Sequence, residues 1–266
     1  MTCNHQFAVR FCVGAPINMI NYTTDEIEVV KKYDKFIGQI DGFSFMNDGY
    51  VDLDQFGFPV SDTNLKLSEK YNSWRYQAQL YKKCLDYAGI EFDTDQGTLL
   101  DLSCGKGGGL SFFKDHYQFQ KLIGVDLNPT HIEICKKNVP DVEFITASAT
   151  DIPLEDSSID IITTVEASAY YDPFDQYLKE SYRLLKPGGM LIQAGPDLFD
   201  MNQYADHGFK FHNIYNITKN VRTACAISKY VLLELDPSGV SFECLLGDES
   251  RYIQGQSFYN IAIFSK

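Results

Sequence analysis

The sequence contains few basic residues and no long apolar run. Its 23 lysines and arginines stand against 36 aspartates and glutamates, which gives a formal net charge of −13. Because an acidic surface repels phosphate groups, this charge argues against nucleic acid as a partner. No stretch approaches the roughly 18 apolar residues of a membrane-spanning helix, and no basic flank precedes an apolar segment at the N-terminus. We therefore expect neither a membrane span nor a signal peptide.

The cysteines show no metal-binding pattern. No two of the seven stand as C-x-x-C, so a zinc knuckle is not expected. Their odd number in a chain of 266 residues indicates free thiols in a reducing compartment. The carboxylates and histidines show no convincing ligand spacing either. We predict a cytoplasmic protein without a tightly bound metal, and the sequence leaves its oligomeric state open, a homodimer included.

Two parts of the chain differ in pattern. Residues 24–40 and 68–89 are predicted to form helices, and residues 41–66, rich in Gly, Asp, Asn and Phe, a loop. After the second helix, short apolar segments alternate with helical ones, as they do in parallel βαβ units. We therefore divide the chain into a helical cap over residues 1–67 and an α/β domain over residues 68–266.

Seven strands are predicted in the α/β domain. Their nearly continuous apolar character indicates a sheet that is covered on both faces. The last strand is compatible with an antiparallel position. The predicted strands span residues 98–102, 121–125, 142–145, 159–165, 189–194, 208–215 and 257–264. The fold class is Rossmann-like α/β, with a seven-stranded, mostly parallel sheet and helices on both faces.

A strand runs into four glycines and then a helix at residues 99–109. Glycine lets backbone N–H groups approach a ligand, although a tight turn without a ligand remains an alternative. The dinucleotide pattern G-x-G-x-x-G fails in both frames, because it would place glycines on Leu110 or Ser103. Asp101 would repel a pyrophosphate, but not a ligand that carries a sulfonium and an amino group. The loop favours S-adenosylmethionine over a dinucleotide.

At these residues the sequence resembles the class I S-adenosylmethionine-dependent methyltransferases. Their first motif, an acid followed by G-x-G-x-G, reads Asp101-Leu-Ser-Cys-Gly-Lys-Gly107 here, with Ser103 in place of the first glycine. The resemblance implies that Asp126 accepts the ribose hydroxyls, as an acid at the end of the second strand can. It places Ser148 and Ala149 at the adenine, with serine where the family has aspartate.

A narrower resemblance joins several segments to the rhamnosyl O-methyltransferase and phthiotriol/phenolphthiotriol methyltransferase group. The segments include Gly107-Gly-Gly109, Asp126-Leu-Asn-Pro129 and Val165-Glu-Ala-Ser-Ala-Tyr170. That group modifies hydroxyls on glycolipids, polyketides and related metabolites, so the resemblance implies O-methylation of a small molecule. The residues that we assign to the S-adenosylmethionine cofactor are Tyr71, Asp101, Ser103, Gly105, Gly107, Asp126, Leu127, Ser148, Ala149, Val165 and Glu166.

The catalytic base is absent from its expected position. A hydroxyl acceptor gains from a general base, but Ala169 stands where the resembled group has a histidine. Tyr170 and Asp197, at the carboxyl ends of strands, are the replacement candidates. N- or C-methylation and a non-catalytic cofactor-binding protein remain alternatives. A nicotinamide or nucleotide-sugar oxidoreductase is disfavoured by the broken glycine pattern.

Overall fold

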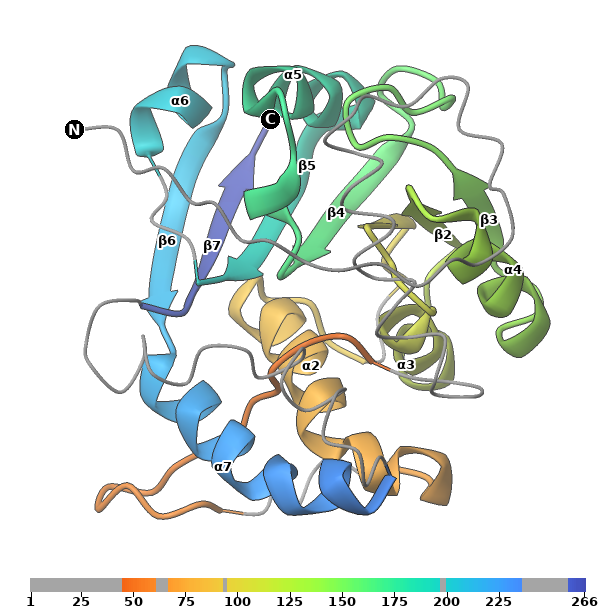
Figure 1. Cartoon of the computed structure of the whole chain (residues 1–266). Coiled ribbons are helices and arrows are strands. Elements are labelled where there is room, and N and C mark those ends of the chain that lie inside the picture. Colours follow the sequence, from red (N-terminus) through yellow and green to blue (C-terminus); the bar gives the residue numbers. More distant parts are fainter. Residues whose placement is uncertain (1–44, 61–66, 93–94, 197–199, 236–257) are drawn as a thin grey trace, which may run out of the picture.

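The structure is a computed structural model, and its core is one seven-stranded sheet with helices packed on it (Figure 1). The helix expected over residues 24–40 and the candidate Asp197 lie outside the described residues. The structure describes residues 45–60, 67–92, 95–196, 200–235 and 258–266.

The strand order is β3-β2-β1-β4-β5-β7-β6. Strands β1 to β5 pair in parallel, whereas β7 is antiparallel to both β5 and β6. The expected mostly parallel sheet and its antiparallel last strand are thus confirmed. The strands are β1 (Thr98–Leu102), β2 (Lys121–Asp126), β3 (Glu143–Thr146), β4 (Ile159–Val165), β5 (Leu185–Gly195), β6 (Lys210–Asn216) and β7 (Asn260–Ser265).

Helices cover both faces of the sheet, as the apolar strands predict. Leu99 and Ile192 point to the face that carries α2, α3, α4 and α7, while their neighbours Leu100 and Leu191 point to α5 and α6. This alternation follows from the two-residue period of a strand. The helical segments are η1 (Glu69–Trp74), α2 (Arg75–Tyr87), α3 (Gly108–His116), α4 (Pro129–Asn138), η2 (Ser168–Tyr170), α5 (Phe174–Leu184), α6 (Met201–Asp206) and α7 (Thr218–Leu235).

Two elements differ in their bounds from the expectation. The helix expected over residues 68–89 opens as the 3-10 segment η1, because the Tyr71 N–H donates to the Ser68 carbonyl three residues earlier. Strand β5 begins at Leu185 rather than at residue 189, because Leu185 pairs with Ile159 ahead of the glycine turn. Main-chain pairing across the sheet extends this strand beyond its apolar run.

The chain order reverses between β1 and β4. The connection after β1 leads to β2 and β3 on one side, whereas the strands after β4 lie on the other side. At such a switch point, the loops that follow the two strands diverge and leave a crevice at their carboxyl ends. The ends of β1 and β4 carry Ser103 and Glu166, so the topology predicts where a ligand binds.

Candidate cofactor and acceptor site

A cavity opens at the carboxyl ends of the parallel strands. Its walls come from the segments that follow β1, β2, β3 and β4, and from residues 45 and 46. The structure brings together most of the residues that the sequence assigns to the site. The assigned residues that line the cavity are Ser103, Gly105, Asp126, Leu127, Ser148, Ala149, Val165, Glu166 and Tyr170.

Three assigned residues do not line the cavity. Gly107 caps α3 in a left-handed conformation (φ 83°), and a Cβ there would lie 3.0 Å from Cys135 Sγ. The hydroxyl of Tyr71 lies 2.5 Å from Asp115 Oδ2, and its ring packs against Phe45, which does line the cavity. Asp101 lies in β1, buried behind the lining. These three residues support the wall rather than form it.

Ser103 replaces the first motif glycine and adopts the conformation that glycine favours. Its φ is 64°, in the left-handed region, and Gly105 follows with φ 55°. The hydroxyl of Tyr171 lies 2.9 Å from Ser103 Oγ and 2.9 Å from Thr164 Oγ1. This contact links the ends of β1 and β4, and it offsets part of the strain of a non-glycine residue at this position.

Asp126 ties the glycine loop to the end of β2. Its Oδ2 accepts the Gly105 N–H at 2.8 Å, and its Oδ1 accepts the Asn128 N–H at 2.9 Å. Asn128 in turn caps α4 by accepting the Thr130 N–H at 2.8 Å. Because each carboxylate oxygen has more than one lone-pair site, Asp126 can still accept hydroxyl protons from the cavity.

Asp101 is a buried carboxyl group at the end of β1. Its Oδ1 accepts the Thr163 hydroxyl at 2.8 Å, and the Tyr81 hydroxyl also favours the charged form of the carboxyl group. Burial raises the pKa of Asp101 to about 7, against the opposing effect of the Thr163 hydroxyl. A cation near this group would lower that pKa again and stabilise the charged form.

Glu166 closes the opposite wall and also has a positive φ, of 59°. Its Oε1 accepts the Asp48 N–H at 2.8 Å and the Tyr259 hydroxyl at 2.5 Å. The carboxylate therefore joins the segment after β4 to the N-terminal segment and to the residue before β7. Strain of this kind persists only where the surrounding contacts determine it, as these two hydrogen bonds do.

Sequence reasoning missed the wall that comes from outside the strand ends. Phe45 and Met46 line the cavity, and a Cβ on Gly105 would meet Met46 Sδ at 2.6 Å. Tyr81 of α2 lines it as well, although α2 precedes the first motif in the chain. All three residues precede the first motif in the chain, and tertiary packing brings them to the site.

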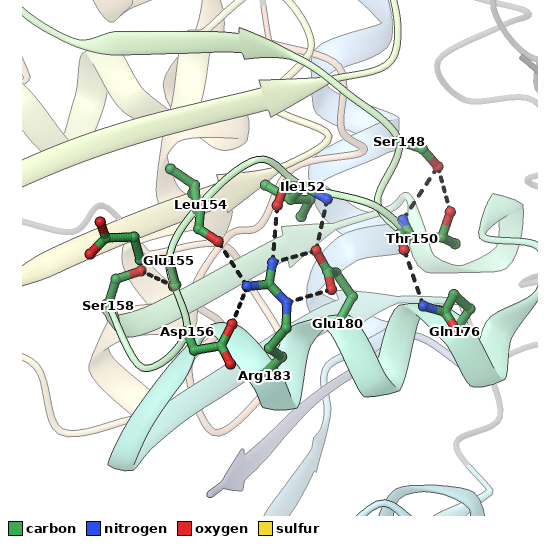
Figure 2. Close-up of polar contacts among 10 residues, drawn as sticks. All are labelled: Ser148, Thr150, Ile152, Leu154, Glu155, Asp156, Ser158, Gln176, Glu180 and Arg183. Carbon is green, nitrogen blue, oxygen red and sulfur yellow. Dashed lines mark hydrogen bonds and ion pairs between the residues drawn. The ribbon is translucent and has the colours of Figure 1, made fainter. Parts of the chain in front are cut away.

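The segment after β3, which carries Ser148 and Ala149, is held by α5. Figure 2 shows the guanidinium of Arg183 among the carbonyl oxygens of this segment, beside Glu180. Arg183 donates to the Leu154 carbonyl at 2.8 Å and to the Ile152 carbonyl at 3.0 Å. Glu180, which is 6% exposed, accepts the Ile152 N–H at 2.7 Å and pairs with Arg183. The pair positions the segment without lining the cavity.

Replacing Arg183 with glutamine is expected to lower the free energy of unfolding by about 2 kcal/mol, because it leaves the buried Glu180 carboxylate without its cation. Urea unfolding would measure this loss. The double variant Arg183→Gln/Glu180→Gln should recover part of it, and Arg222→Gln, an exposed position on α7, is the control. An equal effect of Arg183→Gln and Arg222→Gln would contradict this role.

The comparisons with known proteins agree with this geometry. Residues 100–193 match the family described as "Methyltransferase domain". The fatty-acid O-methyltransferase of Mycolicibacterium smegmatis is 33% identical over 57% of this chain and 52% of its own length. Phthiotriol/phenolphthiotriol dimycocerosates methyltransferase 1 of Mycobacterium ulcerans is 32% identical over 62% of this chain and 57% of its own length. The chain thus spans about half the length of these relatives, and the predicted resemblance is confirmed.

Two solved structures share the fold over almost the whole chain. The cyclase SpnF has a TM-score of 0.68 at 17% identity and covers 92% of this chain and 97% of its own. The geranyl diphosphate C-methyltransferase from Streptomyces coelicolor, solved with S-adenosyl-L-homocysteine, has a TM-score of 0.64 at 16% identity and covers 91% and 98%. At these identities the likeness confirms the Rossmann-like fold alone.

Proposed function

We propose that this chain, whose residues 100–193 match the methyltransferase domain family, is an S-adenosylmethionine-dependent methyltransferase of a small, lipid-like molecule. The observation that carries the proposal is the cavity at the switch point. There Asp126 and the positive-φ residues Ser103 and Gly105 face the same space as Ser148 and Glu166. The reaction that we propose is O-methylation of a hydroxyl.

The residues of the cavity fit the cofactor in charge and in hydrogen bonding. Asp126 would accept the ribose hydroxyls, and Ser148 and Ala149 would lie at the adenine. Asp101, a buried carboxyl group, would face the charged methionine end from behind the wall. A Cβ on Gly105 would clash with Met46 Sδ, so only glycine fits at this position. When bound, the cofactor supplies an electrophilic methyl group on a sulfonium.

The chain's own residues have to position the acceptor and exclude water. Tyr170 lines the cavity and is 41% exposed, and we propose that it contacts the acceptor and orients its hydroxyl. Ala169 is exposed and carries no group that takes a proton. We therefore keep Tyr170 and Asp197 as candidates for the catalytic role, with proximity and desolvation supplying much of the rate.

The acceptor is proposed from the lining and the relatives together. Phe45, Met46, Val165 and Tyr171 give the cavity an apolar and aromatic wall, which suits a hydrocarbon chain or ring. The curated relatives carry names that refer to fatty acids and to phthiotriol lipids. We therefore propose a hydroxylated lipid-like metabolite as the acceptor, in secondary metabolism.

N- or C-methylation and a non-catalytic, cofactor-binding function are the rival candidates. Both are favoured by Ala169, because an amine or a carbanion-like carbon needs less help from a base than a hydroxyl does, and a non-catalytic site needs no base. The likeness to SpnF shows that this fold also serves a protein titled a cyclase, so the fold does not determine the reaction.

Calorimetric titration of wild type and Asp126→Ala tests the cofactor. S-adenosylmethionine and S-adenosylhomocysteine should bind wild type, and the variant should bind at least about a hundredfold more weakly, since Asp126 holds both the ribose and the glycine loop. NAD is the negative control. Binding of NAD alone would overturn the proposal. Transfer of a labelled methyl group to hydroxylated fatty acids, followed by product analysis, separates O- from C-methylation.

The remaining properties rest on coarser observations. None of the helices that the structure describes is both long and apolar enough to cross a bilayer. We propose a cytoplasmic protein that acts on a small molecule, as a homodimer, with residues 1–67 as a cap over the site. The described part of that cap supports this role, because Phe45 packs in the same core as Tyr71 and Tyr81.

A further inference from the structure

His131 is a buried imidazole in the cavity wall. It lies in the first turn of α4, is 3% exposed and lines the cavity. Neither Nδ1 nor Nε2 has a hydrogen-bond partner in the part of the chain that the structure describes. A neutral imidazole carries one donor and one acceptor, and neither forms a hydrogen bond within the described residues, although Nδ1 has the Asp126 carboxylate as a polar neighbour at 3.4 Å.

The position of this ring is fixed by the backbone rather than by its nitrogens. The His131 N–H donates to the Asn128 Oδ1 cap at 3.4 Å, and the preceding Thr130 N–H donates to the same oxygen. The imidazole is thereby held beside Asp126, with Nδ1 at 3.4 Å from Asp126 Oδ1. The cap sets a nitrogen-bearing ring against the carboxylate that both Gly105 and Asn128 already hold in place.

If the His131 side chain only filled space in the core, an imidazole would stabilise the fold less than an apolar side chain of similar size. Buried polar groups without partners destabilise a folded chain and are rare, whereas an apolar side chain of similar size would pack without that cost. Unsatisfied groups of this kind concentrate at functional sites, where a ligand supplies the missing partners. The ring and Asp126 together present a donor and an acceptor side by side.

We propose that His131 binds the ribose of the nucleoside part of the cofactor, together with Asp126. A vicinal diol offers two hydroxyl protons and two acceptor oxygens. The Asp126 carboxylate accepts from the diol, and a ring nitrogen of His131 donates to one of its oxygens. The inference rests on the proposed function, since it takes the ligand to be an adenosyl compound, and it adds His131 to the binding residues.

The test compares His131→Phe with wild type in two measurements. The ligands are S-adenosylhomocysteine and its 2′-deoxy and 3′-deoxy derivatives, titrated by calorimetry. We expect S-adenosylhomocysteine to bind about tenfold more weakly to the variant, the value of one lost hydrogen bond in a buried site. In wild type, removing the hydroxyl that His131 contacts should weaken binding. In the variant that contact is already absent, so removing the same hydroxyl should weaken binding less. His212→Phe, an exposed position on β6, is the control.

Thermal unfolding of the ligand-free proteins separates binding from packing. The melting temperature of His131→Phe should equal or exceed that of wild type, because two unsatisfied nitrogens are removed. An affinity within about twofold of wild type would overturn the inference, as would an unchanged penalty for both deoxy derivatives. A fall in melting temperature that accompanies the loss of affinity would also overturn it. If wild type fails to bind S-adenosylhomocysteine, the proposed function fails and this inference fails with it.

Discussion

Replacement of Gly109 by alanine is expected to abolish measurable cofactor binding and to lower the free energy of unfolding by about 1–3 kcal/mol, as overpacking of a core does. A Cβ at this position would lie 2.3 Å from Cε1 and 2.4 Å from Cζ of Tyr81. Tyr81 is held by the edge of the Phe113 ring, at 5.5 Å between centroids, and by Phe45, so it has little freedom to retreat. Since Tyr81 lines the cavity, a displaced ring enters the space of the ligand.

The direction of the stability change in Gly109→Ala distinguishes a clash with Tyr81 from the ordinary effect of alanine in a helix. Gly109 lies in α3, and without the clash alanine would stabilise a helix by about 1 kcal/mol relative to glycine. Thermal unfolding therefore shows a lower melting temperature if Tyr81 is in the way, and a higher one if it is not. The double variant Gly109→Ala/Tyr81→Leu should restore stability above that of the single variant. A melting temperature raised in Gly109→Ala would refute the packing argument.

The fold could be predicted because its strands carry their own signal. Segments such as residues 159–165 are nearly all apolar or β-branched, so local pattern and final position agree. The observed strand bounds differ from the predicted ones where pairing with a distant strand determines where a strand begins. Leu185 joins β5 because Ile159 lies opposite, and no periodicity within residues 185–189 contains that information.

The residues of the site also fall into two groups, those that the sequence predicts and those that tertiary packing places. Ser103 and Glu166 directly follow β1 and β4, and Asp126 is the last residue of β2. Because the topology brings the carboxyl ends of parallel strands to one edge, sequence order alone places these three residues together. Phe45 and Tyr81 reach the cavity from segments that precede β1, and only the packing of α2 on the sheet determines their position. Tyr71 does not line the cavity, but its ring packs against Phe45, which does.

Asp101→Asn is expected to stabilise the ligand-free protein at neutral and alkaline pH while weakening its affinity for S-adenosylmethionine. The pKa of Asp101 is about 7 in the folded protein and near 3.9 in an unfolded chain. The folded state thus holds this proton more tightly. Its contribution favours folding most below about pH 4 and is lost as the pH rises through about 7. Above that pH, burying the charged carboxylate lowers the free energy of unfolding by about 4 kcal/mol, because the folded and unfolded pKa values differ by about three units at 1.36 kcal/mol each.

Asparagine keeps an oxygen that can accept the Thr163 hydroxyl but removes the charge, so this cost disappears in the variant. The difference in melting temperature between variant and wild type should grow from pH 5.5 to about 7.5 and then level off. The affinity of wild type for S-adenosylmethionine should rise over the same interval, since the ammonium group favours the ionised carboxyl, and the affinity of the variant should stay flat. Parallel pH profiles of affinity for the two proteins would show that Asp101 does not sense the cofactor. In that case its burial would be a structural property of β1 alone.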